Sequence, residues 1–238
     1  MTNTHALPVF RQIVDDLKRQ IADGQLTEHA ALPSERVIAE LHAVSRMTAR
    51  RALEAVEAEG LAYSKRRQGR FVSPKRLMYD VGSMANFVAG AAAQGIEIEM
   101  ELLESTTIQA SGTLVETLSA AHGTKLYQNT RLIRSKGHSI FVETETVIAE
   151  RCAALWPGPD NVDLQRQRYS PLGHTAEIVI RMCALEPDPA RLLGAMPYQA
   201  GIEQEQLSRD ESGAPICFSH QIWRGEMAQF SATAIISR

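Results

Sequence analysis

Four side chains that can bind phosphate or the edge of a base fall within positions 46 to 51, namely Arg46, Thr48, Arg50 and Arg51. A guanidinium group pairs with phosphate as an ion or with guanine through two parallel hydrogen bonds, and a hydroxyl group can serve either purpose. The competing interpretation is a solvated cationic face on an ordinary helix. The acidic side chains of the same segment gather at its other end, at Glu54, Glu57 and Glu59. This polarity suits one end that meets phosphate and one that points away.

Two short helical patterns position these side chains. The first follows Ser34, whose hydroxyl can cap free backbone N–H groups. Its expected apolar face consists of Val37, Ile38 and Leu41. The second begins at Ser45 and ends at Gly60, and its expected inward residues are Met47, Leu53 and Val56. Because only residues 42–44 separate the two patterns, they predict a helix-turn-helix, whose second helix enters the major groove of DNA.

An amphipathic helix over residues 8–23 precedes this pair, and a hairpin follows it. Strand-like pieces at residues 61–63 and 71–72 flank a tip that has Gly69 at its turn. The cations of this tip are Lys65, Arg66, Arg67 and Arg70. Three helices and a hairpin predict a winged helix-turn-helix, and the cationic tip could reach phosphates or a neighbouring groove. A solvated charged turn is the alternative for any single one of these cations.

The distribution of charge agrees with a nucleic-acid partner at one end. The net charge of the 238 residues is −3, but residues 1–76 hold 13 Lys and Arg against 9 Asp and Glu. The remaining residues hold 12 against 19. A basic N-terminal module suits DNA binding, and an acidic remainder suits a different task. Chance also gives such an asymmetry, so the charge alone decides little.

The three cysteines, Cys152, Cys183 and Cys217, are widely spaced and odd in number. No Cys/His cluster has zinc-site spacing, so we expect reduced thiols, no metal and no cofactor. Charged residues interrupt the N-terminus early, and the longest weakly polar run, residues 84–93, is too short to cross a bilayer. These features predict a soluble cytoplasmic protein without a membrane partner.

The second half of the chain predicts an α+β domain with an antiparallel sheet. Alternating residues over 96–102 predict a half-buried strand, and residues 111–121 a helix. Two hairpins are expected, the first from strands 125–134 and 139–148, the second from strands 202–208 and 216–223. Asp188 and Pro189 predict the start of a short helix that ends at Gly194. We therefore expect domains at residues 1–73 and 83–238, joined by a linker over 74–82.

Residues 8–72 resemble the DNA-binding domain of GntR-family bacterial transcription regulators. The resemblance rests on LPSER, VSRMTARRAL, EAEGL and QGRFV, which occur in the family's order. It implies that Arg36, Arg46, Thr48, Arg50 and Gly69 contact operator DNA. We add their neighbours Ser34, Ser45, Arg51, Arg66 and Arg70 as candidates. Met47 and Arg70 depart from the residues that the family often has at these positions.

Residues 83–236 resemble the UTRA effector-binding domain of the HutC-type branch, a fold shared with chorismate lyase. The matching segments are TRLIRSKGHSIFVETE and DPARLLGAMPYQAGIEQEQLSRDESGAPICFSHQIWRGE. The resemblance implies a small, often anionic metabolite that faces Arg131 and Glu143. Further candidates are Arg134, Tyr169, His174 and Arg224. For Arg131 and Glu143 the alternative is a cross-strand ion pair, and for Arg224 it is a structural pair with Glu226.

Two functional hypotheses follow. The first is a ligand-responsive repressor, which as a homodimer binds a palindromic operator on double-stranded DNA and changes its affinity when an effector binds. The second is an enzyme that uses the lyase-like domain for catalysis. The sequence contains no GxSxG motif, no phosphate-binding glycine loop and no nucleophile with an evident base, which favours the repressor.

Overall fold

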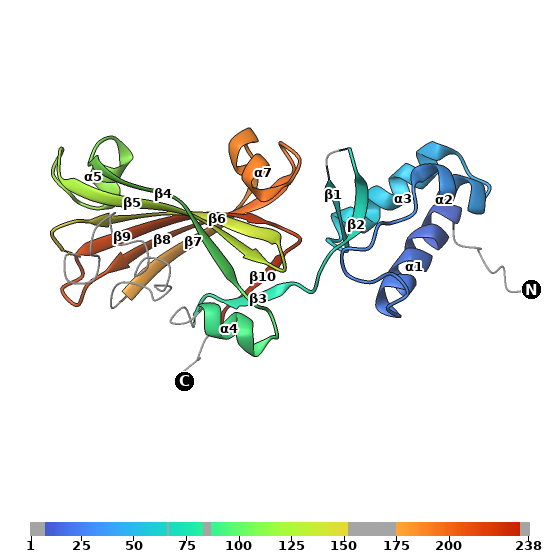
Figure 1. Cartoon of the computed structure of the whole chain (residues 1–238), viewed down its shortest axis with the longest axis horizontal. Helices are drawn as coiled ribbons and strands as arrows, with labels where there is room; N and C mark the ends of the chain where they lie inside the picture. The colour runs from blue at the N-terminus through green and yellow to red at the C-terminus, as the bar shows by residue number, and fades with distance from the viewer. Residues whose placement is uncertain (1–7, 66, 83–86, 152–174, 234–238) are drawn as a thin grey trace, which may run out of the picture. The chain divides into compact units, whose positions relative to one another are not determined.

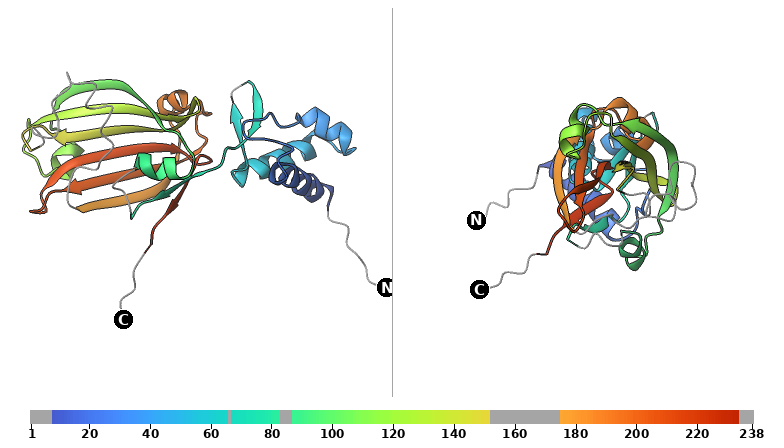
Figure 2. Two further views of the ribbon diagram at one scale, coloured as in Figure 1. Left: turned by 60° about the horizontal axis from the view of Figure 1, so that its bottom comes forward. Right: turned by 90° about the vertical axis from the view of Figure 1, so that its left-hand side faces the viewer.

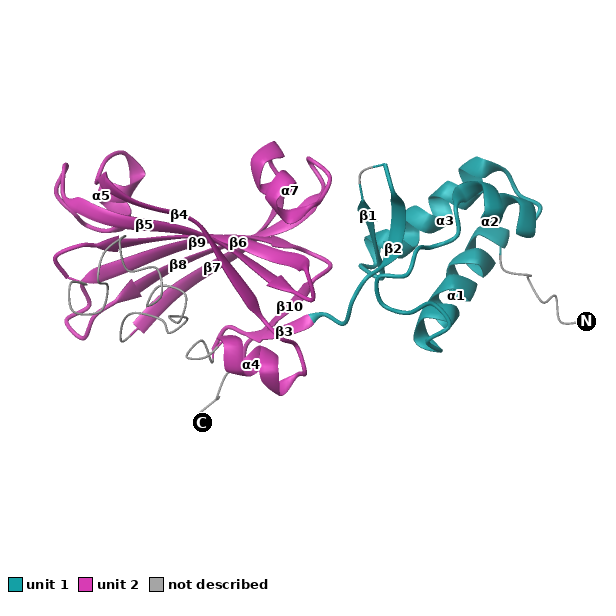
Figure 3. Ribbon diagram, in the orientation of Figure 1, with its two compact units in different colours: residues 1–76 teal, residues 77–238 magenta. Residues whose placement is uncertain are grey.

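The computed structural model describes residues 8–65, 67–82, 87–151 and 175–233. The chain forms two compact units, residues 1–76 and residues 77–238, which Figure 3 shows in different colours. The boundary falls inside the expected linker. Residues 77–80 form a strand of the second unit, so most of the expected linker, residues 74–82, belongs to the second unit.

The first unit is a winged helix-turn-helix, as the sequence predicted. Its elements are α1 (Val9–Ala22), α2 (Glu35–Leu41), α3 (Arg46–Ala58), β1 (Ala62–Lys65) and β2 (Gly69–Val72). Both predicted caps form, because Ser34 Oγ accepts a hydrogen bond from Val37 N at 3.4 Å and Ser45 Oγ accepts one from Thr48 N at 3.1 Å. Strands β1 and β2 pair antiparallel and form the wing.

The core of this unit differs from the expected one at three positions. Val37, Leu41 and Met47 are 41%, 74% and 62% exposed, so the prediction that they point inward is wrong. The inward face of α3 consists of Ala49, Ala52, Leu53 and Val56. At about 100° per residue, a side chain two positions before Ala49 lies on the far side of the helix. Met47 therefore belongs to the exposed surface of α3 beside Arg46.

The second unit is built on one antiparallel six-stranded sheet in the order β4-β5-β6-β9-β8-β7. Its strands are β4 (Glu99–Gln109), β5 (Lys125–Ser135), β6 (His138–Ile148), β7 (Thr175–Ala184), β8 (Ala200–Arg209) and β9 (Pro215–Arg224). Two short strands, β3 (Leu77–Asp80) and β10 (Ala228–Ser231), pair parallel to each other. The helices are α4 (Phe87–Ala93), α5 (Thr113–Thr117) and α7 (Pro187–Leu193).

Local signals predicted both hairpins. The β5–β6 turn has positive φ at Lys136 and Gly137, 49° and 73°, as a two-residue turn between twisted strands requires. Helix α7 ends at Gly194, as predicted, but its N-cap is Glu186 rather than Asp188. The predicted helix over 111–121 forms only at Thr113–Thr117. The first predicted strand begins later than expected, at Glu99, and continues past a register shift to Gln109.

Helices lie on both sides of the sheet (Figure 1). Helices α5 and α7 lie on one face, where Leu118 packs near Leu126 and Leu193 near Leu132. The opposite face carries an aromatic cluster beneath α4, β3 and β10. At its centre the Trp223 ring stacks on Phe141 with a centroid separation of 3.8 Å. No helix among the described residues combines the length and apolar composition needed to cross a membrane.

Candidate functional site

The first candidate site is the N-terminal half of α3. Arg46, Met47 and Arg50 are exposed and Thr48 is half-buried. The Thr48 hydroxyl lies 3.0 Å from Ser45 Oγ, so the cap also fixes this side chain. No described carboxylate forms an ion pair with Arg46. This turn therefore presents a cation, a hydroxyl and an apolar side chain, which are the groups that read base edges and phosphates.

Two of the predicted arginines make exposed pairs within their own helices. Arg36 Nη1 lies 2.9 Å from Glu40 Oε1, and Arg50 Nε lies 2.9 Å from Glu54 Oε1. The hydrogen bond that Arg50 donates to Glu54, followed by the charges of Glu54 and Glu35, raises the pKa of Arg50. Exposed pairs of this kind contribute little to stability, so both guanidinium groups can exchange their carboxylates for phosphate.

Arg70 is held more firmly. Arg70 Nε lies 3.0 Å from Glu57 Oε2 and its Nη1 lies 3.3 Å from Glu35 Oε1, with only 18% of the side chain exposed. Arg70 therefore ties the wing to α2 and α3, a structural role that the sequence did not suggest.

The exposed Arg51 lies over the Phe10 ring at 5.9 Å. Gly69 has a φ of 103°, which favours glycine at the wing turn, and Arg66 lies outside the described residues.

The second candidate site is a buried polar band on the sheet face that also carries the aromatic cluster. Strand register aligns it in two adjacent rows across the sheet. The first row is Ser105, Asn129, Glu145, Ser219 and Gln206, and the second is Arg131, Glu143, Gln221 and Gln204. Rows with apolar side chains border the band on both sides, Ile133-Phe141-Trp223 and Tyr127-Val147-Cys217. The band is therefore a polar strip inside an otherwise apolar interior.

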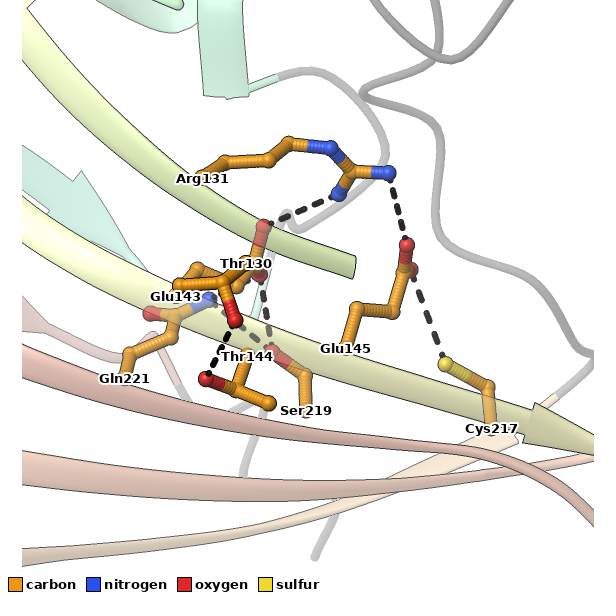
Figure 4. A network of polar contacts seen from close by, with 8 residues as sticks. All are labelled: Thr130, Arg131, Glu143, Thr144, Glu145, Cys217, Ser219 and Gln221. Atoms are coloured by element: carbon orange, nitrogen blue, oxygen red, sulfur yellow. Dashed lines mark hydrogen bonds and ion pairs between the residues drawn. The ribbon is translucent and has the colours of Figure 1, made fainter. Parts of the chain in front are cut away.

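Arg131 is the centre of the polar band. Its Nη1 lies 3.2 Å from Glu143 Oε2, and its Nη2 lies 3.0 Å from Glu145 Oε2 (Figure 4). Ser219 Oγ and Gln221 Nε2 each donate to Glu143 Oε1 at 2.8 Å. Thus one guanidinium group faces two carboxylates, and the predicted pair of Arg131 and Glu143 is directly bonded and buried.

Burial on this side of the sheet perturbs two titrating groups, Glu143 in the polar band and Tyr79 in the aromatic cluster. Desolvation is the largest cause that raises the pKa of Glu143, and the charge of Glu145 adds to it, against the opposing effects of Arg131, Ser219 and Gln221. Desolvation, followed by the charge of Glu143, raises the pKa of Tyr79 to about 12, against the opposing effect of Gln204. The band therefore holds a carboxyl group that accepts a proton more readily than usual, which is common at binding and catalytic sites.

Part of the polar band lacks hydrogen-bond partners. Asn129 is fully buried, and neither its Oδ1 nor its Nδ2 has a partner among the described residues. The same holds for Oγ of the neighbouring Ser105. Each buried polar group left unsatisfied costs about 1–3 kcal/mol, so these atoms call for a partner from outside the chain, such as a ligand or an ordered water molecule.

The other predicted effector residues lie elsewhere. Arg134 is half-exposed and lies 2.7 Å from Glu101 on β4. Arg224 is buried on the α7 side of the sheet, where its Nη2 lies 2.6 Å from Glu226 and its Nη1 donates to Leu193 O at 3.4 Å. It therefore stabilises the last turn of α7, in line with the structural alternative. Tyr169 and His174 lie outside the described residues.

Sequence reasoning missed Asn129, Glu145, Ser219 and Gln221. A signal was present for three of them, because β6 and β9 each carry a run of polar residues, 143–146 and 219–221, between apolar residues. Only the pairing of the strands shows that these positions are neighbours.

Three possible metal ligands also meet on the face of the sheet that carries α5 and α7, although the sequence analysis predicted no metal site. Glu203, Glu205 and His220 offer ligand atoms within 4.8 Å of one another. Arg181 pairs with both carboxylates, and His220 Nε2 lies 2.7 Å from Glu203 Oε1. The guanidinium group thus supplies the positive charge that a metal ion would otherwise bring.

Replacing Asn129 with leucine, which has a similar shape, should stabilise the ligand-free protein. The variant removes two unpartnered buried polar atoms, so we expect its free energy of unfolding to rise by about 1 kcal/mol or more in denaturant titrations. Gln128→Leu on the opposite face is the control, because the Gln128 amide donates to Thr146 Oγ1 at 3.1 Å. Asn129→Leu destabilising the protein as much as Gln128→Leu would contradict the assignment.

The raised pKa of Glu143 predicts a pH dependence of stability. Above the ordinary carboxyl pKa of about 4.3 the unfolded chain has released this proton while the folded chain retains it. The contribution of Glu143 is therefore complete below that pH and is lost as the pH rises through the folded pKa. Unfolding free energies measured from pH 4 upward should fall less steeply for Glu143→Gln than for the wild type. Parallel curves would refute the shift.

Comparison with known proteins places both units in one family. Residues 10–72 match the family of bacterial regulatory proteins called gntR, and residues 93–229 match the UTRA domain. The HTH-type transcriptional repressor NagR of Bacillus subtilis (strain 168) is 26% identical over 210 residues, which cover 88% of this chain and 82% of NagR. The HTH-type transcriptional regulator YihL of Escherichia coli (strain K12) is 29% identical over 222 residues, covering 89% and 92%.

A solved structure shares the fold of the whole chain. The crystal structure of PhnF from Mycobacterium smegmatis covers 94% of this chain and 100% of PhnF, with a TM-score of 0.61 and 22% identity. The order of elements, the matched domains and the relatives agree with one another. The chain therefore belongs to the gntR family of bacterial regulatory proteins, as a transcription regulator that carries a UTRA domain.

Proposed function

We propose that this regulator is a cytoplasmic, ligand-responsive repressor that binds a twofold operator as a homodimer. A small polar metabolite in the polar band changes its operator affinity. The observation that carries the DNA-binding part is the exposed N-terminal half of α3, where Arg46 has no competing carboxylate among the described residues. A single recognition helix reads only a few base pairs, so two copies on adjacent half-sites provide the specificity that a promoter requires.

The arginines divide into two roles in this proposal. Arg46, Arg50 and Arg36 are exposed and bind DNA, while Arg70 holds the wing in place through Glu57 and Glu35. Met47, exposed beside Arg46, is placed to contact the methyl group of a thymine. In this proposal the side chains of α3 therefore determine which bases are preferred. The wing, held by Arg70, determines how the unit is positioned on the operator.

The effector part of the proposal rests on the polar band. Asn129 and Ser105 have unpartnered polar atoms, which suit a ligand rich in hydroxyl groups. Arg131 is the only cation of the band as defined, and both of its ion pairs are with carboxylates. An anionic group of the ligand would replace Glu145, whose side chain is more exposed than that of Glu143, 16% against 6%. We therefore propose that the ligand is a hydroxylated metabolite and that its anionic group binds Arg131, as the resemblance to the UTRA domain implies.

Effector control requires that the ligand bind two arrangements of the dimer with different affinities. Typical coupling free energies of about 1–3 kcal/mol change operator affinity roughly 5- to 150-fold. Such a change is enough to switch repression without unfolding either unit.

Arg46→Ala should weaken specific operator binding by about 1–3 kcal/mol, roughly 5- to 150-fold, because it removes a cation that contacts DNA directly. The probe is the duplex that the wild-type protein enriches from a random library, and affinity is measured by mobility shift at fixed salt. Arg19→Ala is the matched control, since it removes an exposed arginine of α1 that pairs with Asp16. Wild-type affinity of Arg46→Ala would reject this docking of α3.

A further inference from the structure

Carboxylates outnumber cations in the polar band. Its charged side chains among the described residues are Arg131, Glu143 and Glu145. The two rows that border the band carry no charged side chain. The strands that hold the charged groups, β5 and β6, lie inside the sheet between its edge strands β4 and β7 (Figure 2). A ligand that brings a further negative charge therefore enters a buried site that already has an excess of carboxylates, which is costly unless the charge is compensated.

The two carboxylates of the band are not equivalent. Glu143 Oε2 faces Arg131, and Glu143 Oε1 accepts two further hydrogen bonds from side chains of β9. Glu145 Oε2 also faces Arg131, but its Oε1 faces only the thiol of Cys217 at 3.6 Å, and a thiol is a weak donor (Figure 4). Glu145 therefore depends on Arg131 for its partner more than Glu143 does, and it is the carboxylate that a ligand displaces more easily.

The displacement of Glu145 creates a second requirement. When an anionic group takes its place on Arg131, the Glu145 carboxylate loses its only cationic partner among the described residues. The side chain is 16% exposed, so water compensates only part of that loss. A ligand that carries an ammonium group beside its anionic group supplies the missing partner. Such a ligand also leaves the net charge of the band unchanged, whereas a simple anion makes it more negative.

The side chain next to Glu145 suits an ammonium group as well. Asn129 lies directly opposite Glu145 in the register of β5 and β6. Its amide oxygen is buried and accepts no hydrogen bond from a described residue. An ammonium group has three N–H donors, so it can donate to Glu145 and to Asn129 Oδ1 together. Charge balance and the unpartnered acceptor are independent observations, and both point to the same ligand group.

We propose that the effector is a zwitterion, whose anionic group binds Arg131 and whose ammonium group binds Glu145 and the amide oxygen of Asn129. This inference rests on the anion-binding band of the proposed function and narrows its ligand class. It assigns to Glu145 the selection between ligands that differ only in an ammonium group in place of a hydroxyl group. A hydroxyl group in that position donates one uncharged hydrogen bond and leaves the displaced carboxylate without a cation.

Isothermal titration calorimetry of the full chain tests the ligand class with matched pairs of compounds. The pairs are serine with glycerate, aminoethylphosphonate with hydroxyethylphosphonate, and glucosamine phosphate with glucose phosphate. In a pair that binds, the ammonium member should bind at least about 10-fold more tightly, the effect expected of a hydrogen bond between charged groups. Glu145→Gln should remove this preference, because a neutral amide needs no cation. Glu101→Gln is the control and should keep the preference, since Glu101 pairs with Arg134 outside the band.

Three results would overturn the zwitterion. They are a hydroxyl member that binds as tightly as its ammonium counterpart, a panel in which no ammonium member binds, and a preference that survives in Glu145→Gln. Circular dichroism verifies the fold of both variants. A hydroxyl member that binds the wild type and not Asn129→Leu would leave the proposed function standing while the ammonium site falls. The proposed function fails separately, if a compound that binds the band leaves operator affinity unchanged.

Discussion

The main physical constraint in the second unit is the burial of one guanidinium group between two carboxylates. Desolvating Arg131, Glu143 and Glu145 is costly, and the cost is offset only because each group has partners at hydrogen-bonding distance. Apolar residues in these positions would stabilise the sheet at least as well. Stability therefore does not explain the polar band, which agrees with its proposed role in binding, and the unpartnered amide of Asn129 within it supports this view.

The first unit separates structural and binding arginines by the same physical criterion. Arg70 is mostly buried and bridged to two carboxylates, which fixes the wing, whereas Arg46 at the start of α3 is exposed. Glu35 on α2 and Glu57 on α3 both pair with the structural arginine. The same sequence thus builds a rigid module and leaves a cationic surface on it.

Much of this architecture follows from local signals. Ser34 and Ser45 cap the two helices, and Lys136-Gly137 turns a hairpin, because these features depend only on neighbouring residues. The parallel pairing of β3 with β10 joins segments about 150 residues apart, and no local pattern shows it. The inward assignment of Met47 failed because apolar character alone does not distinguish a core face from an exposed one. The polar band could be predicted only at Arg131 and Glu143, since its other members become neighbours through strand register.

The central claim is that a ligand in the polar band controls operator binding by the first unit. It is tested most directly with a compound, drawn from sugar phosphates, phosphonates and carboxylates, that raises the melting temperature of the wild-type protein. Operator affinity is then titrated at fixed salt with and without this compound, for the wild type and for Asn129→Leu. We expect a change of roughly 5- to 150-fold in the wild type and none in the variant. An equal change in both proteins, or no change in the wild type despite binding, would contradict the account.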